Sequence, residues 1–255
     1  MQPKSISEQF REQFQISLAD TNDLKKEVYR IRYEVYCQEL NYEATDKFPD
    51  RLETDIYDDR SLHCLLKHRA SGVYAGCIRF VFPDPYQPER SLPLNKVCSL
   101  DLDLSQLPPY SYGEVSRLAV LSRFRRRFGE SQTPGGLLFF NDRSQEGEEK
   151  RGFPVIALSL YLAATCIGME AGVERVFVLM EPKLARHLRY FGFVFTQIGD
   201  FVDFRGKRGP YQIRRQEVEN SLPAQIRELM EVVRSDLIVS PTFIPIHNSQ
   251  LSIRN

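Results

Sequence analysis

The stretch Tyr112–Phe128, YGEVSRLAVLSRFRRRF, constrains the fold of this chain more than any other. Its first ten residues alternate between apolar and polar side chains, a pattern that predicts a β-strand. Glu114 and Arg117 lie three residues apart in this strand, and a cationic loop follows. Buried charges need one another, because a lone buried charge costs several kcal/mol. We therefore expect a central strand that carries a buried charge pair beside a site for an anionic carrier.

The order of the other predicted elements indicates the fold class. Apolar periodicity and turn residues predict strands at 14–18, 62–67, 73–82 and 173–180, a further strand after Gly192 and a hairpin over 203–213. Helices are predicted over 24–40, 155–171, 182–190 and 221–233. The first strands are joined as hairpins. The only predicted βαβ crossover lies between residues 112 and 180. This order favours a mixed α/β sheet with helices on both faces.

The chain is expected to form one domain with extensions at both ends. Residues 1–20 are predicted to form an N-terminal arm and the first strand, and residues 21–215 the core. Within the core, the polar, glycine-rich segment 121–152 is interpreted as a basic loop and a flap insertion. Residues 216–255 are predicted to form a C-terminal helix and tail.

Composition excludes several classes of protein. The chain has 34 basic and 34 acidic residues, and zero net charge argues against a general nucleic-acid binder. Five cysteines without a C-x-x-C pair indicate neither a zinc site nor a disulfide framework. The N-terminus has no apolar signal core, and no run approaches the roughly 20 apolar residues of a membrane span. We expect a cytoplasmic protein without a transmembrane segment.

Charged residues outside the central strand suggest its partners. Arg79 lies inside an apolar strand, and an acidic segment containing Asp55 and Asp58 precedes the strand at 62–67. Together with Glu114 and Arg117, these residues could form a structural ion-pair network or line a catalytic site, and the two interpretations are compatible. The acidic segment lacks the glycine and the terminal glutamate of a calcium loop, so no metal site is expected.

The arginine run has two interpretations. It could be a solvated loop, or it could hold a phosphate at the loop that leads into the main helix. Neither of the glycine-rich nucleotide-binding patterns, G-x-x-x-x-G-K and G-x-G-x-x-G, is present. The arginines in question are Arg123, Arg125, Arg126 and Arg127.

The charged positions, taken as a set, carry a family resemblance. The set comprises Arg32-Tyr-Glu-Val-Tyr36, Tyr42, Glu53-x-Asp55-x-x-Asp58, Gly76-x-x-Arg79 and Glu114-x-Ser116-Arg117. Over about residues 20–200 this set resembles the acyl-homoserine-lactone (autoinducer) synthases, which are acyltransferases of the GNAT superfamily.

The second half is similar to a sister group, the long-chain N-acyl amino acid synthases and the acyltransferases associated with the exosortase/PEP-CTERM system. This similarity rests on Ser116-Arg-Leu-Ala-Val, the arginine run, Glu181-Pro-x-Leu-x-Arg and Phe191-Gly-Phe.

The resemblance implies a single GNAT-like domain with splayed central parallel strands, an acyl donor on acyl carrier protein, and transfer to an amine. The family usually has Trp where this chain has Tyr42, which favours an amino acid acceptor over S-adenosylmethionine. The coenzyme A loop is degenerate at Arg126–Gly129, which favours the carrier protein over acyl-CoA as the donor. No tightly bound cofactor is expected. The alternatives are an acyl-homoserine-lactone synthase, an acetyl-CoA-dependent N-acetyltransferase, and a degenerate GNAT module that only binds a ligand.

The resemblance also suggests roles for individual residues. Glu114 would accept a proton from the amine, with Ser116 and Arg117 beside it in the catalytic centre. Acceptor binding or the structural charge network is assigned to Arg32, Tyr36, Tyr42, Asp55, Asp58 and Arg79. Backbone N–H groups at Leu118, Ala119 and Val120 would polarise the thioester, and the four arginines would meet the donor's phosphate. The fatty-chain tunnel is assigned to Phe80, Leu158, Leu162, Phe177 and Phe193.

Overall fold

The computed structural model describes residues 4–125 and 155–238. One mixed sheet organises them, with the strand order β1-β2-β3-β4-β5-β8-β6, and β7 pairs with β8. Arg126, Arg127 and the predicted flap lie outside the described residues. The strands are β1 Phe14–Leu18, β2 Ser61–His68, β3 Tyr74–Val81, β4 Tyr112–Val120, β5 Arg175–Met180, β6 Thr196–Gln197, β7 Val202–Asp203 and β8 Lys207–Arg214.

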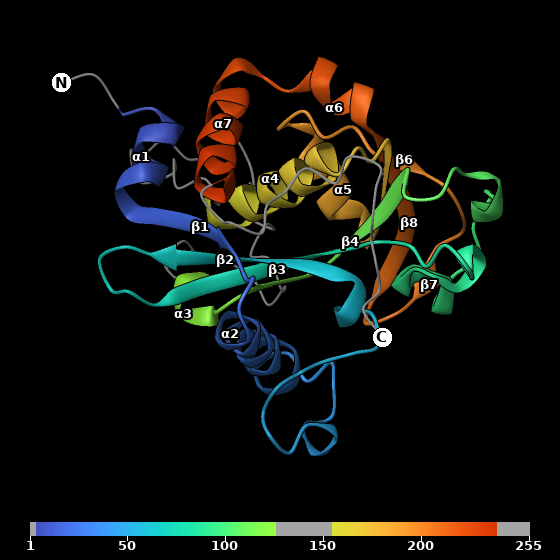
Figure 1. Cartoon of the computed structure of the whole chain (residues 1–255), viewed down its shortest axis with the longest axis horizontal. Coiled ribbons are helices and arrows are strands. Elements are labelled where there is room, and N and C mark those ends of the chain that lie inside the picture. The colour runs from blue at the N-terminus through green and yellow to red at the C-terminus, as the bar shows by residue number, and fades with distance from the viewer. Residues whose placement is uncertain (1–3, 126–154, 239–255) are drawn as a thin grey trace, which may run out of the picture.

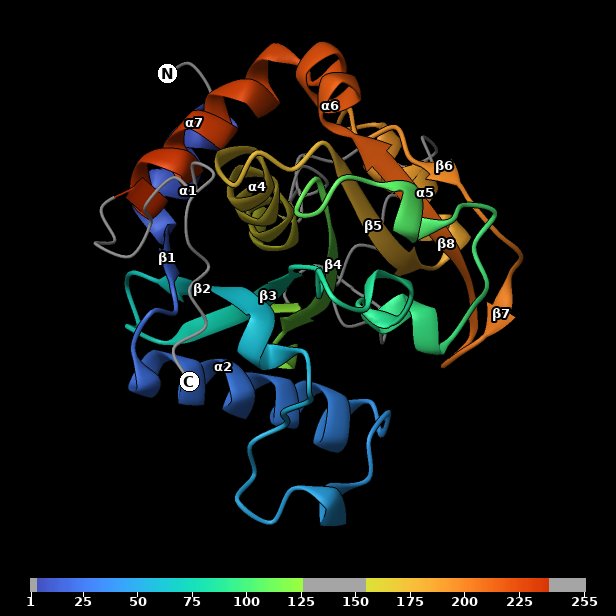
Figure 2. The same cartoon turned by 45° about the vertical axis from the view of Figure 1, so that its right-hand side comes forward.

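Helices cover both faces of the sheet, as predicted (Figure 1). On one face, α2 contacts β2, β3 and β4 and continues into a π-helical segment, so the predicted helix over 24–40 is two helical segments. On the other face, α4 contacts β2, β3 and β4, and α7 packs on α4, α1 and β1 (Figure 2). The helices are α1 Ile6–Gln13, α2 Asn22–Tyr33, the π-helix Glu34–Glu39, α3 Ser122–Arg125, α4 Val155–Glu170, α5 Pro182–Arg189, α6 Arg215–Ser221 and α7 Ala224–Ile238.

The C-terminal helical region departs from the sequence-based prediction. One helix was expected to begin at Ser221, whereas α6 ends at that residue and α7 begins at Ala224. Pro223 stands between the two helices, and the residue before a proline disfavours the helical conformation. Among the described helices, none combines the length and apolar character needed to cross a bilayer.

The two parallel strands at the centre of the sheet separate. β4 and β5 pair only through Tyr112–Arg175, Gly113–Val176 and Glu114–Phe177, although β4 continues to Val120. The opening therefore begins at Glu114 and widens toward the C-terminal ends of both strands. On the side facing β5, β4 has no strand partner past Glu114 within the described part of the chain. Alternate backbone N–H groups of this stretch consequently face the opening.

A β-bulge in β4 redirects the side chains after Ser116. Arg79 of β3 pairs with Ser116, whereas Cys77 pairs with Ala119, so β4 carries one extra residue between these pairs. Arg117, at the bulge, has a left-handed backbone with φ +52°. Strict alternation would have placed Ser116 and Arg117 on opposite faces. The bulge instead lets both side chains join one network.

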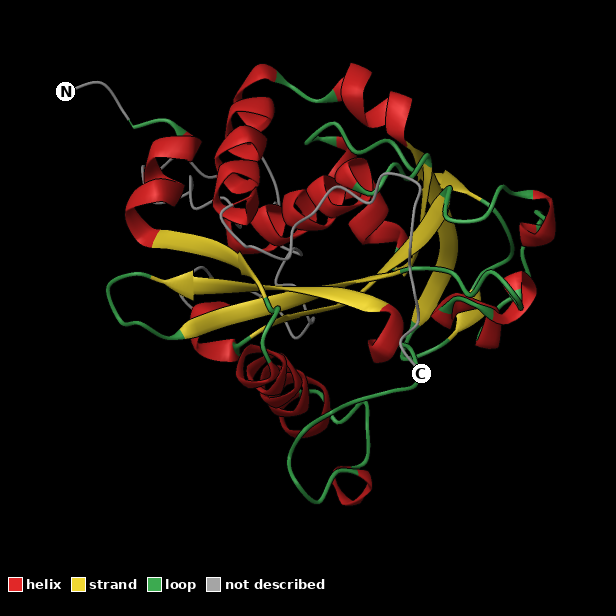
Figure 3. Cartoon of the chain, viewed as in Figure 1, coloured by secondary structure: helices red, strands yellow, loops and turns green. Residues whose placement is uncertain are grey.

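The region between β3 and β4 is irregular, as its prolines predict (Figure 3). It contains three short 3-10 turns, at Pro88–Arg90, Pro93–Lys96 and Leu104–Gln106. Leu92, Leu94 and Leu104 from this region form a separate small core with Tyr112 of β4 and Phe177 of β5. This core closes the narrow end of the β4–β5 opening on the side that carries Glu114.

Candidate active site

Arg32 is the most enclosed cation of a buried charge network. It projects from α2, and its side chain is fully buried. Its guanidinium donates to the Glu53 carboxylate through Nε and to Asp58 Oδ1 through Nη1, the latter at 2.6 Å. Both carboxylates come from the loop that precedes β2. Two buried acids therefore tie this loop to α2.

Arg79 and Arg117 complete the network from β3 and β4. Arg79 Nη1 donates to Asp55 at 2.6 Å and to Asp58 at 2.8 Å, and its Nε donates to the Ser116 hydroxyl at 3.1 Å. Arg117 Nη2 lies 3.0 Å from Glu53 Oε1 and 3.1 Å from Asp55 Oδ2. The predicted structural network thus exists, with three guanidiniums facing three carboxylates.

The network keeps its acids ionised. Burial by itself would raise the pKa of Glu53, but the neighbouring Arg32 and Arg117 guanidiniums outweigh it and hold that pKa below its usual value. Burial would raise the pKa of Asp58, but Arg32 and Arg79 together with the Asp55 N–H outweigh it and hold that pKa far below its usual range. His63, 3.6 Å from Asp58, stays neutral because burial, reinforced by Arg32, lowers its pKa to about 3.

Glu114 lies beside the network but outside it. Its side chain is 2 % exposed, and Oε2 accepts a hydrogen bond from the Leu94 N–H at 2.9 Å. Among the described residues it forms no salt bridge, so the expectation that guanidiniums pair with Glu114 is wrong: Arg79 and Arg117 are bound to Asp55 and Glu53. Burial raises the pKa of Glu114 to about 8, although the Leu94 N–H and the two guanidiniums oppose this shift.

The elevated pKa gives Glu114 an acid–base character near neutral pH. A carboxyl with a pKa near 8 can both accept and return a proton under physiological conditions. It sits where the β4–β5 opening begins. No other carboxyl among the described residues is this deeply buried without a cationic partner. The geometry therefore singles out Glu114 as the candidate acid–base group.

Tyr36 and Tyr42 form an aromatic pair on the α2 side of β4. Their ring centroids are 6.3 Å apart, and the Tyr36 hydroxyl donates to the Leu118 carbonyl at 2.7 Å. The Arg117 guanidinium lies 5.6 Å from the Tyr36 ring centroid, and Arg205 lies 5.4 Å from that of Tyr42. The pair is thus anchored to β4 just after the bulge.

The residues predicted to bind the donor separate into two groups. Leu118, Ala119 and Val120 lie in the part of β4 that borders the opening. Arg123 is about half exposed and pairs with Glu34 at 3.0 Å, whereas Arg125 is buried and pairs with Glu39. Both acids belong to the π-helical segment, so these two arginines fix the end of β4 to that segment.

The five predicted tunnel residues do not line one cavity. Phe80, Leu158, Leu162 and Phe193 belong to the main core on the α4 side. Phe177 belongs to the small core with Tyr112, because alternation along β5 points it to the opposite face from Val176 and Val178. Of the five, only Phe193 lines the apolar pocket of this region.

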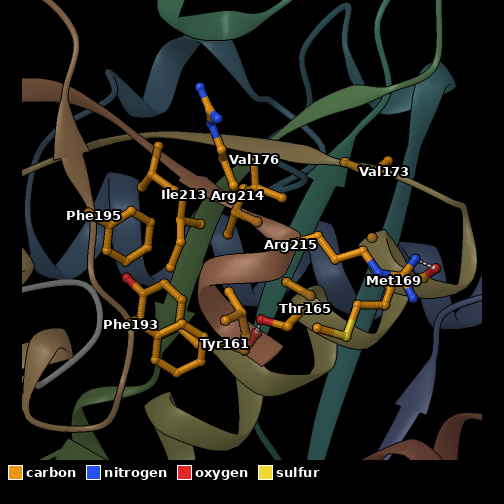
Figure 4. Close-up of a pocket in the computed structure, with 15 residues that line it drawn as sticks. Tyr161, Thr165, Met169, Val173, Val176, Phe193, Phe195, Ile213, Arg214 and Arg215 are labelled. Atoms are coloured by element: carbon orange, nitrogen blue, oxygen red, sulfur yellow. Dashed lines mark hydrogen bonds between the residues drawn. The ribbon is translucent and has the colours of Figure 1, made fainter. Parts of the chain in front are cut away.

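That pocket lies between α4, β5 and β8, and its cavity volume is about 40 Å³ (Figure 4). It reaches β4 at Val115, directly after Glu114, and β5 at Val176 and Val178. Its remaining lining includes Tyr161, Ala164, Thr165, Gly168, Met169, Phe195 and Ile213. An apolar chain held there would start at the narrow end of the opening.

Sequence reasoning missed Glu53 as the centre of the network. Its carboxylate is 1 % exposed and bridges Arg32 and Arg117. The signal was present, because Glu53 belongs to the acidic motif, but the sequence could not show which of four neighbouring acids points inward. Within the described residues, no group of His, Cys, Asp and Glu is arranged to hold a metal ion.

Comparison with known proteins identifies the domain and the fold. Residues 31–133 match the acetyltransferase (GNAT) domain family. No curated protein matches this sequence. TofI, solved in a ternary complex with an inhibitor and MTA, has a TM-score of 0.56 and 16% identity, and the match covers 84% of this chain and 96% of TofI.

Two further structures are similar. BjaI, a CoA-dependent acyl-homoserine lactone synthase solved with SAM and isopentyl-CoA, has a TM-score of 0.54 and 18% identity, over 81% of this chain and 86% of BjaI. FeeM, an N-acyl amino acid synthase from uncultured soil microbes, has a TM-score of 0.50 and 14% identity, over 82% of this chain and 94% of FeeM. Residues 31–133 therefore match a GNAT acetyltransferase domain, and the chain has the fold that these synthases share.

Proposed function

We propose that this protein is an N-acyltransferase that moves a medium- or long-chain acyl group from acyl carrier protein to the amine of an amino acid or a related small acceptor. The observation that carries the proposal is the β4–β5 opening, with the buried, unpaired carboxyl of Glu114 where it begins. An acyl thioester in this opening would meet free backbone N–H groups of β4 on one side and an acid–base group at the narrow end.

The chemistry follows from these positions. The acceptor's amine nitrogen attacks the thioester carbonyl carbon, and the alternate N–H groups within residues 118–120 that face the opening stabilise the negative charge that develops on the oxygen. Glu114, ionised in the reactive state, takes a proton from the nitrogen, directly or through water. The C–S bond then breaks, the thiolate leaves, and the proton returns from Glu114 to the sulfur. The amide product and the free thiol balance the reaction.

The apolar pocket supports a fatty acyl donor rather than acetyl. Its lining is almost wholly apolar, and it begins at Val115, one residue from the proposed reaction centre. Each buried methylene stabilises a bound chain by about 0.8 kcal/mol. A longer acyl chain that packs along this lining would therefore be favoured over acetyl in proportion to the methylenes that it buries.

Filling the pocket should shorten the preferred chain. Ala164 is buried and lines the pocket, and Ala164→Leu adds three carbon atoms there. If three methylenes of a palmitoyl donor are displaced, kcat/KM should fall by about 50-fold, at about 0.8 kcal/mol each. An octanoyl donor should react within about 3-fold of wild type. Steady-state kinetics with both donors checks this, and an equal fall with both would place the chain elsewhere.

An amino acid is favoured over S-adenosylmethionine as the acceptor by the surroundings of Tyr42. The Arg205 guanidinium lies over the Tyr42 ring, and Arg208 lies 6.0 Å from the same centroid. Arg205 is paired with Glu43, whereas Arg208 forms no salt bridge with any described residue, so the uncompensated charge of Arg208 beside the aromatic pair disfavours a sulfonium.

A donor and acceptor screen tests the proposal. The full-length protein is incubated with palmitoyl–acyl carrier protein or palmitoyl-CoA and the twenty amino acids, and the lipid extract is analysed by mass spectrometry. We expect N-palmitoyl amino acids with the carrier protein as the better donor. Parallel reactions with S-adenosylmethionine and with acetyl-CoA test the two enzyme alternatives. Binding of acyl donor without any product would identify a ligand-binding module instead.

A further inference from the structure

The tip of the β7–β8 hairpin places two arginines beside the aromatic pair. Arg205 forms a salt bridge with Glu43 and lies 4.8 Å from the Phe204 ring centroid. It also lies over Tyr42, as described above. Arg205 is thus neutralised and held on three sides, so its position is fixed by the fold.

Two arginines of this region hold strained backbones. Arg205 has φ +56° and Arg117 has φ +52°, both in the left-handed region that favours glycine. Such conformations cost about 1–3 kcal/mol each and cluster at functional sites. The chain keeps two of them on either side of the Tyr36–Tyr42 pair. Arg117 takes this conformation at the β-bulge of β4 and Arg205 takes it in the turn between β7 and β8, so the backbone fixes where both side chains begin.

Arg208 carries the only guanidinium of this cluster without a carboxylate partner in the described part of the chain. Arg117 is bound to Glu53 and Asp55, and Arg205 to Glu43, whereas Arg208 forms no salt bridge with any described residue. Its Nε is a buried donor without an acceptor. A buried, unused donor costs about 1–3 kcal/mol, so this position favours an incoming anion.

Arg208 lies at the wide end of the opening. The next residue, Gly209, pairs with Met180, the last residue of β5. Across the opening, the Arg208 guanidinium lies 6.0 Å from the Tyr42 ring centroid, and Tyr36, which packs against Tyr42, donates to the Leu118 carbonyl of β4. Arg208 therefore belongs to the β5–β8 wall and faces the stretch of β4 where the thioester carbonyl is proposed to lie.

We propose that Arg208 binds the carboxylate of the acceptor, so that the acceptor is an α-amino acid recognised by its charged carboxylate. This inference rests on the proposed acyltransferase function. A guanidinium binds a carboxylate through two parallel hydrogen bonds, which also orient it. The carboxylate of an α-amino acid is attached to the same carbon as the amine, so holding it at Arg208 directs the nitrogen into the opening. The phosphate of the donor is separated from the thioester by the whole pantetheine arm, whereas the carboxylate of an α-amino acid is one carbon atom from the attacking amine.

Kinetics of Arg208 variants tests the assignment with matched acceptors. Amino acids and their carboxamides serve as probes that differ in the carboxylate alone. Arg208→Gln should raise the KM for the amino acids by about 10–100-fold, the range expected for a hydrogen bond to a charged group, and change kcat less than about 3-fold. Wild type should prefer the acids over the carboxamides, and the variant should lose that preference. Arg208→Lys, which keeps the charge, should recover part of it.

Lys207→Gln is the matched control, because Lys207 is an exposed cation on the same hairpin. It should leave both KM values within about 2-fold of wild type. A rise in the KM for the acyl donor instead of the acceptor would assign Arg208 to the donor's phosphate and overturn the inference. The inference would also be overturned if a folded, active Arg208→Gln protein preferred the amino acids over their carboxamides as strongly as the wild type does. Absence of acyl transfer in the wild type with every donor would instead refute the proposed function itself.

Discussion

Glu114→Gln is expected to lower acyl-transfer turnover by about 10²–10⁴-fold, the usual contribution of a positioned general base. The substitution keeps the size of the side chain, and the amide oxygen can still accept from the Leu94 N–H. What it removes is the ability to take a proton. Single-turnover kinetics with saturating donor and acceptor measures the chemical step directly.

The Glu114→Gln substitution should also change how the acyl-transfer rate depends on pH. Because burial raises the pKa of Glu114 to about 8, the wild-type rate should rise with pH and level off above about pH 8, where the carboxyl is ionised. The Gln variant should lack this inflection. Glu34→Gln makes the same chemical change at a more exposed residue and should leave turnover within about 2-fold. Full turnover in Glu114→Gln, with the inflection intact, would leave Glu114 as a structural acid.

The raised pKa of Glu114 also makes the free energy of unfolding depend on pH. The folded protein binds the Glu114 proton more tightly than the unfolded chain, since its pKa moves from 4.5 to about 8. Its contribution to the free energy of unfolding is therefore present in full below about pH 4.5 and is lost as pH rises toward 8. Glu114→Gln, which cannot ionise, should be more stable than wild type at pH 9. Urea denaturation of both proteins at pH 6 and pH 9 measures the difference.

Removal of the buried Arg32 guanidinium should destabilise the fold by about 3–5 kcal/mol, because it leaves buried carboxylates with less than the positive charge that compensates them. Arg32→Met keeps most of the side chain's volume but leaves Glu53 with Arg117 alone and Asp58 with Arg79 alone. The loop before β2 should then detach from α2. Urea denaturation of the wild type and the variant measures this loss. If both proteins have the same m-value, the shift in the midpoint multiplied by that m-value gives the change in the free energy of unfolding.

Arg30→Ala is the control for this prediction. Arg30 lies on the same helix, its side chain is 58% exposed, and it pairs with Glu27 on the surface. Exposed pairs contribute about 0–1 kcal/mol. Equal losses in the two variants would show that the buried network adds nothing beyond ordinary surface pairing.

The sequence alone determined the class of fold and most members of the network, although it included Glu114 and missed the central place of Glu53. Alternation in Tyr112–Val120 and the hairpins before it are local patterns, and they predicted a mixed sheet correctly. Arg79 in an apolar strand demanded buried partners, and the acidic loop was the available source. The first inference depends on short-range periodicity, and the second depends on the free-energy cost of an unpaired buried charge. Both can be assessed from a single sequence.

The tertiary structure alone decided which charges meet and which remain free. The bulge at Arg117 is a register shift between two strands, and it moved Arg117 onto Glu53 while leaving Glu114 without a cation. The apolar pocket and the position of Arg208 arise from α4, β5 and β8 converging around the opening, whose residues are distant in sequence. Strand register and helix packing are set by contacts between distant segments, so a periodic pattern within one segment cannot encode them.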